Sequence, residues 1–156
     1  MPISMDEIKI LRKETGARIM DCKKALEESK GDYKKALEVV EEKGLARAEK
    51  NADRETKAGY VASYVHNNGQ VASLVEIVCE TDFVAKNDEF VTMARDIAMH
   101  VTAMNPENVK DLLEQEFIRD ASVTIAMMLK SLSGKIGEKM VITRFVRYEI
   151  GEESSK

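Results

Sequence analysis

The sequence is poor in the residues that mark disulfide-rich, zinc-binding and membrane proteins. Among 156 residues there are two cysteines, two histidines, two prolines and no tryptophan. Cys22 and Cys79 lie far apart and show neither CxxC nor Cys/His spacing, so we expect no disulfide framework and no zinc site. No apolar run approaches the about 18 residues that span a bilayer, and the N-terminal MPISMDEIKI lacks the features of a secretory signal. We therefore expect a cytoplasmic protein without a membrane partner.

Motifs that carry catalytic chemistry are also missing. The chain has no GxxxxGK[ST] loop, no GxGxxG and no HExxH. His66 lies beside an expected turn and His100 near the end of an expected helix, as surface or packed histidines commonly do. Cys79 has no histidine near it in sequence and is typical of a small apolar filler in a strand. We expect neither bond-breaking chemistry nor a bound cofactor or metal.

The charge distribution argues against nucleic acid as a direct partner. The formal net charge is −4, and Lys and Arg alternate with Glu and Asp almost everywhere. Arg144, Phe145, Arg147 and Tyr148 do interleave basic and aromatic residues on an expected strand. Strand alternation, however, places Phe145 and Arg147 on one face and Arg144 and Tyr148 on the other. An RNA-binding sheet therefore remains a weaker hypothesis, which predicts strongly salt-dependent affinity.

The first 45 residues predict a module of three short helices. Ser4 and Glu7 form a capping-box pattern, and Thr15-Gly16 ends the first helix. The second helix runs to a break at Gly31, and the third continues to Gly44 with apolar residues at helical spacing. Residues 46–58 are rich in Ala and in charges of both signs, which favours an exposed connecting helix. The two modules are expected to meet there.

Residues 59–151 predict an α+β core. Two β-rich runs flank Asn67-Asn68-Gly69-Gln70, and Asn-Gly supplies the positive φ angles of a tight hairpin. One helix is expected to follow from Phe90 to Val101, another from Pro106 through Phe117, and a third from Ile125 to Ile136. Residues 140–151 complete a three-stranded antiparallel sheet packed against helices, and residues 152–156 are expected to be a disordered tail.

An acidic residue stands beside a large aromatic between the second strand and the first core helix, in Thr81-Asp82-Phe83-Val84. In one interpretation Asp82 caps the coming helix and Phe83 packs beneath the sheet. Asn87 is an equally good cap five residues later, and a helix starting there would leave residues 81–86 as a connecting turn. The residues alone leave the two alternatives open.

Three motifs carry a resemblance. The chain contains LRKETGARIMDCKKAL near its N-terminus, TDFVAKN after a strand ending in VCE, and KIGEKMVITRFVRYEIG near its C-terminus. Together they resemble the bacterial translation elongation factor Ts family, in order and over essentially the whole chain. The region after Asn105-Pro106 looks shorter than in most members, which carry a longer helical insertion or a second core repeat.

The resemblance implies a guanine-nucleotide exchange factor that binds the GTPase elongation factor Tu, GDP-bound or nucleotide-free, and promotes GDP release. It implies that the N-terminal module, similar to ubiquitin-associated three-helix domains, docks on the GTPase. It also implies that the turn formed by Thr81, Asp82, Phe83 and Val84 reaches toward the magnesium and phosphate site, with Phe83 as a wedge. The resemblance implies that Arg12, Met20 and Lys23 belong to the docking surface of this module, with Met20 and Lys23 in direct contact with the partner.

Two further expectations accompany the resemblance. Members with a single core can work as homodimers, which makes a second copy of the chain another candidate partner. A different class of function, a helical adaptor that binds a protein through its N-terminal module without exchange activity, predicts that residues 1–55 suffice for its effect. The Asp82-Phe83 pair distinguishes the hypotheses, because only the exchange factor uses it.

Overall fold

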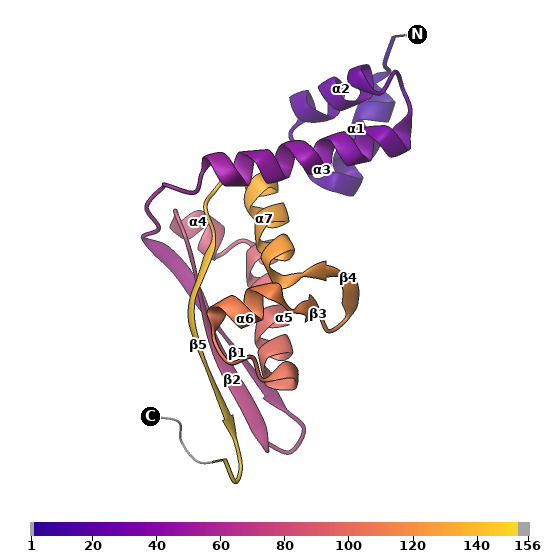
Figure 1. Ribbon diagram of the computed structural model, residues 1–156. Coiled ribbons are helices and arrows are strands. Elements are labelled where there is room, and N and C mark those ends of the chain that lie inside the picture. Colours follow the sequence, from indigo (N-terminus) through magenta and orange to yellow (C-terminus); the bar gives the residue numbers. More distant parts are fainter. Residues whose placement is uncertain (1, 153–156) are drawn as a thin grey trace. The chain divides into compact units, whose positions relative to one another are not determined.

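The computed structural model describes residues 2–152 and has the expected α+β class (Figure 1). The chain divides into two compact units. The first unit comprises Met1–Asp53 with Lys130–Glu138, and the second comprises Arg54–Leu129 with Lys139–Lys156. Among the described residues, no helix is both long enough and apolar enough to cross a membrane.

The first unit begins with the three expected helices, α1 (Met5–Thr15), α2 (Ile19–Glu28) and α3 (Tyr33–Lys50). Ser4 and Glu7 form the capping box at the start of α1, and Gly16 ends that helix with a left-handed φ of 65°. One apolar stripe from each helix faces a common core, whose buried members are Ile8, Leu11, Ala17, Cys22, Ala25, Leu26, Ala36 and Val40.

The expected connecting helix over residues 46–58 is not a separate element. Helix α3 continues through Gly44 to Lys50, and residues 51–57 are not helical. Residues 45–50 are mostly good helix formers, so one glycine does not end the helix. Gly44 also meets Gly134 of helix α7 (Ile125–Ile136), whose second half packs within this unit. Gly44, at which the sequence suggests the end of a helix, is therefore the point where α3 and α7 cross closely.

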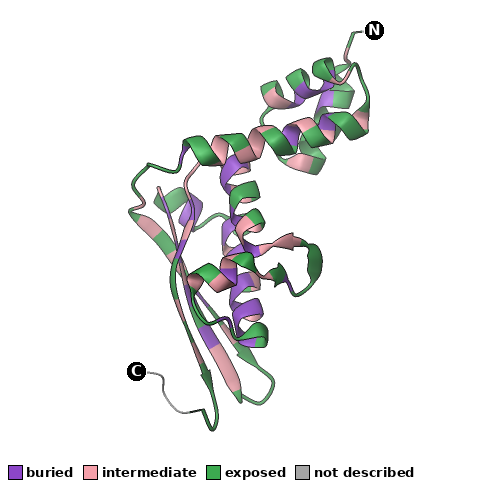
Figure 2. Ribbon diagram, in the orientation of Figure 1, coloured by how far each residue is buried: buried purple, intermediate pink, exposed green. Residues whose placement is uncertain are grey.

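The second unit is built on a three-stranded antiparallel sheet with the order β1 (Ala58–His66), β2 (Val71–Cys79), β5 (Val141–Glu149). The expected β1–β2 hairpin is present, with residues 67–70 as its loop, but the positive φ angles lie at Asn67 and Gly69 and not at both residues of the Asn68-Gly69 pair. Helix α5 (Asp88–Met104) covers one face of the sheet, and Figure 2 shows buried residues along this helix. Ser73 of β2 and Thr102 of α5 share a buried hydrogen bond of 2.8 Å, which ties helix to sheet.

The expected helix from Pro106 through Phe117 is wrong at both ends. Helix α6 covers only Val109–Glu114, and the Asn108 side chain caps it by accepting the Asp111 N–H. The chain then forms a small hairpin, β3 (Glu116–Phe117) with β4 (Asp120–Thr124). Phe117 is buried in this hairpin, where its ring lies 6.0 Å from that of His100. Tertiary packing of one aromatic thus outweighs the helical spacing.

The C-terminal strand extends as expected, and the first residue of the expected tail is held in place. Glu152 lies 3.1 Å from the guanidinium of Arg147. Residues 153–156, the remainder of the expected disordered tail, lie outside the described residues.

Candidate functional site

The turn between β2 and α5 contains a single-turn helix, α4 (Asp82–Ala85). Thr81 is its N-cap residue, with extended backbone angles and a hydroxyl that accepts the Val84 N–H at 3.4 Å. Asn87 then caps α5 by accepting the N–H groups of Glu89 and Phe90. The cap expected at Asn87 is confirmed, whereas the helix-capping role considered for Asp82 belongs to Thr81.

The side chains of α4 divide sharply between the core and the solvent. Val84 and Ala85 are each 7% exposed, whereas Phe83 is 90% exposed. The interpretation in which Phe83 packs beneath the sheet is therefore wrong. A helix of one turn has two short faces, and burial of Val84 and Ala85 on one of them leaves Phe83 projecting from the other. Asp82 beside it is also exposed. The molecule thus presents an uncovered aromatic next to a carboxylate on an anchored turn.

Glu80, immediately before this turn, connects it to two other segments of the second unit. Its Oε2 accepts the backbone N–H of Lys139 at 2.6 Å, and its Oε1 lies 3.6 Å from the guanidinium of Arg54. The Glu80 side chain is only 18% exposed. The sequence did not single out this residue, because a glutamate at a strand end carries no local signal of a contact 59 positions away.

The three expected docking residues lie at the surface of the first unit. Arg12 is in the last turn of α1, and Met20 and Lys23 are three positions apart on α2, which places them on one face of that helix. Met20 is 58% exposed and its neighbour Ile19 is 45% exposed. Lys23 forms a 3.9 Å ion pair with Glu27. These exposed side chains are apolar and basic.

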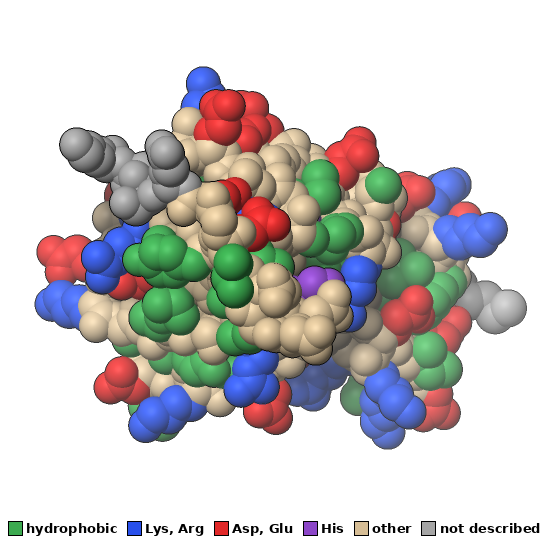
Figure 3. Space-filling view, turned by 90° about the horizontal axis from the view of Figure 1, so that it is seen from below, with side chains coloured by type: hydrophobic (Ala, Val, Ile, Leu, Met, Phe, Trp, Pro, Cys, Tyr) green, Lys and Arg blue, Asp and Glu red, His purple; other side chains and the backbone are tan. Residues whose placement is uncertain are grey.

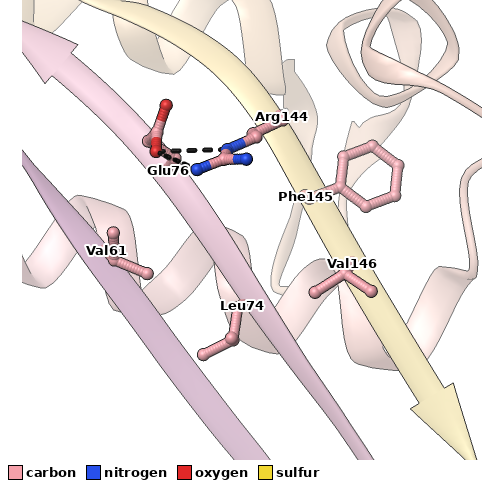
Figure 4. A pocket seen from close by; sticks show the side chains of 6 residues that line it. All are labelled: Val61, Leu74, Glu76, Arg144, Phe145 and Val146. Atoms are coloured by element: carbon pink, nitrogen blue, oxygen red, sulfur yellow. Dashed lines mark hydrogen bonds and ion pairs between the residues drawn. The ribbon is translucent and has the colours of Figure 1, made fainter.

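The outer face of the sheet, opposite α5, is apolar and uncovered, which the residue pattern alone did not predict. Exposed residues on this outer sheet face are Val61 and Val65 of β1, Leu74 of β2, and Val146 and Tyr148 of β5. A hollow of about 440 Å³ lies on this face, and Figure 4 shows the side chains of all three strands that line it. Glu76 is one of the residues that line the hollow. Hydrogen bonds from the Thr143 hydroxyl and the Arg144 guanidinium keep the pKa of the Glu76 carboxyl below its usual value. The sequence feature that could have indicated this apolar outer face is the presence of apolar residues on both sides of each strand.

The basic and aromatic residues of β5 do not form a platform for stacking bases. Arg144 is paired with Glu76 on the outer sheet face. On the other face Arg147 is 11% exposed and donates to the Thr102 carbonyl at 2.9 Å, besides its ion pairs with Glu149 and Glu152. In the space-filling view acidic and basic side chains are interspersed (Figure 3). Arg147 therefore serves contacts within the fold, whereas the Arg144 side chain, although paired with Glu76, is 80% exposed.

The two histidines are far from a catalytic arrangement. His66 is exposed and stacks on Tyr64. His100 is buried, with Nε2 at 2.8 Å from the Gln115 side-chain oxygen and Nδ1 accepting the Ile118 N–H. Within residues 2–152 no group of three or more His, Cys, Asp or Glu side chains could hold a metal ion, and the buried Cys22 and Cys79 form no disulfide.

Comparison with known proteins agrees with the sequence resemblance. The family model described as elongation factor TS matches residues 80–156. The chain is 41% identical to elongation factor Ts of Fervidobacterium nodosum over 197 aligned residues, covering 97% of this chain and 100% of that protein. It is 40% identical to elongation factor Ts of Thermotoga neapolitana, covering 98% and 100%, and 41% identical to that of Desulforamulus reducens, covering 99% and 92%.

These alignments are longer than the chain itself. They span 196 to 199 positions, whereas the chain has 156 residues, so the relatives carry residues that this chain lacks. The expectation of a shorter chain agrees with this difference. Identity of about 40% over nearly the full length of both proteins leads to one conclusion: the chain belongs to the elongation factor Ts family.

Proposed function

We propose that this protein is a guanine-nucleotide exchange factor for elongation factor Tu and acts by inserting the Asp82–Phe83 turn near the magnesium and phosphate site of the GTPase. The observation that carries the proposal is the 90% exposure of Phe83 on an otherwise anchored turn. Burial of an exposed aromatic side chain against a partner lowers the free energy of the complex. A turn that is already capped and packed loses little conformational entropy on binding. Membership of the elongation factor Ts family supports the exchange role.

The magnitudes indicate that the turn does not act alone. Burial of one Phe side chain contributes about 1.5–3 kcal/mol. A thousandfold acceleration of GDP release requires about 4 kcal/mol, at about 1.4 kcal/mol for each factor of ten. Further contacts must therefore supply binding energy that drives the turn into the nucleotide site. We propose that Arg12, Met20 and Lys23 of the first unit make such contacts, since all three are exposed.

The proposed mechanism requires no bond to be broken and no cofactor of the protein's own. Magnesium neutralises phosphate charge and holds the switch loops of GTPases in place. A wedge that displaces the support of the metal loosens GDP. The Asp82 carboxylate beside the wedge would lie near the phosphates, where its negative charge disfavours the bound nucleotide.

Thermodynamic linkage gives a direct test of the proposed function. If the protein weakens GDP binding by a given factor, GDP must weaken binding of the protein by the same factor. Isothermal titration calorimetry of this protein into nucleotide-free and GDP-bound elongation factor Tu measures that factor. We expect tight binding to the nucleotide-free form and weaker binding to the GDP form, matching the loss of GDP affinity measured separately. Equal affinity for both forms would reject exchange and favour the adaptor hypothesis.

We also propose that two copies of the chain pair through the outer sheet face. Val61, Leu74 and Val146 leave apolar surface in water there, and a second copy would cover it. A Leu74→Asp variant would bury a carboxylate in that contact, which costs several kcal/mol. We expect sedimentation velocity to detect a concentration-dependent dimer for the unmodified protein and only monomer for the variant. A monomer at all concentrations for both would dismiss the pairing.

A further inference from the structure

Glu80 immediately follows β2, and its side chain makes a hydrogen bond beyond the point at which the backbone pairing of β2 and β5 ends. The β2–β5 pairing ends with Ile77 opposite Ile142 and Val78 opposite Val141. The same register carried two residues further places Glu80 opposite Lys139. There the Glu80 carboxylate accepts the Lys139 N–H at 2.6 Å. A hydrogen bond to an ionised acceptor is about twice as strong as a neutral one. The carboxylate thus extends the pairing of β2 and β5 up to the residue that precedes the turn.

The same carboxylate also binds the chain on the other side of β2. Arg54, four residues before β1, places its guanidinium 3.6 Å from the Glu80 Oε1. All three residues belong to the second unit. Glu80 therefore holds together the approach to β1, the end of β2 and the approach to β5. This junction forms the base from which the Asp82–Phe83 turn projects.

The turn itself is too short to fix its own direction. Helix α4 has four residues, and a single turn of helix has little stability without tertiary contacts. On its inner side the turn is held by buried Val84 and Ala85. On its entering side the Cys79 thiol donates to the Thr81 carbonyl at 3.3 Å. Together with the Glu80 junction, these contacts determine where the exposed Phe83 ring points.

We infer that Glu80 is a positioning residue for nucleotide exchange, whose contacts with Lys139 and Arg54 hold the turn in the orientation that presents Phe83 to the partner. This inference rests on the proposed function of Phe83. Without the Glu80 contacts the turn samples several orientations. Only the molecules in which Phe83 points toward the partner can then promote exchange. Binding through the first unit would persist while the exchange step slows.

The test compares Glu80→Ala and Glu80→Gln in the release of a fluorescent GDP analogue from elongation factor Tu, with the full-length protein titrated to saturation. Glu80→Ala is expected to lower the maximal release rate about tenfold, equivalent to about 1.4 kcal/mol, while changing the half-saturating concentration less than twofold. Glu80→Gln keeps a side-chain oxygen that can accept the Lys139 N–H, so it is expected to restore most of the rate. Equal rates for Glu80→Ala and the unmodified protein would overturn the inference.

A matched control separates positioning from general stability. Asp96 of α5 pairs with Arg119 in the same unit, and its side chain is 28% exposed. Asp96→Ala therefore removes a comparable ion pair away from the turn and is expected to leave the rate unchanged. Thermal unfolding of each variant gives its folded fraction. If Glu80→Ala lowers the release rate only in proportion to its folded fraction, the positioning role is contradicted.

A double variant shows whether Glu80 acts through Phe83. If it does, Glu80→Ala combined with Phe83→Ala releases GDP no more slowly than Phe83→Ala alone. Additive losses would overturn the inference while leaving the proposed function intact. An unchanged rate for Phe83→Ala would instead reject the proposed function itself.

A spectroscopic readout keeps the inference testable if Glu80→Ala is poorly folded. The chain has four phenylalanines, so incorporation of 4-fluorophenylalanine gives four ¹⁹F resonances, and the Phe83→Leu variant identifies one of them. Under the inference, Glu80→Gln shifts or broadens the Phe83 resonance less than Glu80→Ala does, and the buried Phe90 resonance stays in place in Glu80→Gln. A Phe83 resonance unaffected by either substitution would overturn it.

Discussion

Replacing Phe83 with alanine is expected to lower the maximal rate of GDP release from elongation factor Tu by about 10- to 100-fold. The range follows from the about 1.5–3 kcal/mol that burial of a Phe side chain contributes, at about 1.4 kcal/mol per factor of ten. Because Phe83 is 90% exposed, its removal leaves no cavity. The free energy of unfolding is therefore expected to change by no more than about 0.5 kcal/mol. Stopped-flow release of a fluorescent GDP analogue and chemical denaturation measure the two quantities.

The matched control is Ile118→Ala, which truncates another exposed apolar side chain of the same unit. Ile118 is 46% exposed in the small hairpin, and its backbone N–H donates to His100 Nδ1, a bond that the substitution leaves in place. This variant is expected to exchange nucleotide at the unmodified rate. If Phe83→Ala and Ile118→Ala behave alike, the turn has no special role, and the exchange must arise from other contacts.

The second large effect is expected at the helix crossing of the first unit. A Cβ atom added at Gly134 of α7 would lie 1.8 Å from the carbonyl oxygen of Gly44 in α3, a distance that no folded protein tolerates. The helices must therefore move apart, which also strains the 3.0 Å hydrogen bond from Arg47 to the Gly134 carbonyl. Overpacking of this kind costs about 1–3 kcal/mol. Gly134→Ala is expected to destabilise the protein by that amount in chemical denaturation.

Gly44→Ala provides the control, because it changes the same crossing from the other side. A Cβ atom at Gly44 meets its nearest neighbour at 3.9 Å, an ordinary contact. Alanine in a helix interior is about 0.5–1 kcal/mol more favourable than glycine. Gly44→Ala is therefore expected to be neutral or stabilising. If both variants shift the free energy of unfolding in the same direction, the asymmetric crossing is not present in solution.

The sequence specified elements whose signals are local. The capping box at Ser4, the Asn-Gly hairpin turn and the apolar periodicity of α5 each arise from interactions within a few residues, and the structure contains all three. The three N-terminal helices and the three-stranded antiparallel sheet followed from the same patterns, whereas the strand order β1-β2-β5 comes from the structure. Local propensity and tertiary packing agree in these segments, which makes them predictable.

Features decided by distant contacts were missed or misjudged. Gly44 suggested a helix end, whereas its meeting with Gly134 makes the glycine part of a helix crossing. Phe117 matched a helical spacing, but it packs against His100 from a strand. Glu80 bonds to a backbone N–H that comes 59 residues later. None of these pairings leaves a pattern within a sequence window, so only the folded structure identifies them.

The candidate site likewise has a part that the sequence indicated and a part that only the structure determines. The motif around Phe83 was recognised by resemblance, but the residues alone allowed both a buried and a presented ring. Capping by Thr81 and burial of Val84 and Ala85 determine which alternative holds, and they leave Phe83 in solvent. The outer sheet face was not foreseen, because apolar residues on both faces of a strand usually indicate a strand buried on both sides.

The most direct test of the central claim is the rate at which a fluorescent GDP analogue leaves elongation factor Tu, at fixed magnesium concentration, with and without this protein. The account predicts that release accelerates as the protein is added, reaches a plateau, and falls back when Phe83→Ala replaces the unmodified protein. Detectable binding with no acceleration at any concentration would contradict the account and make the protein an adaptor rather than an exchange factor.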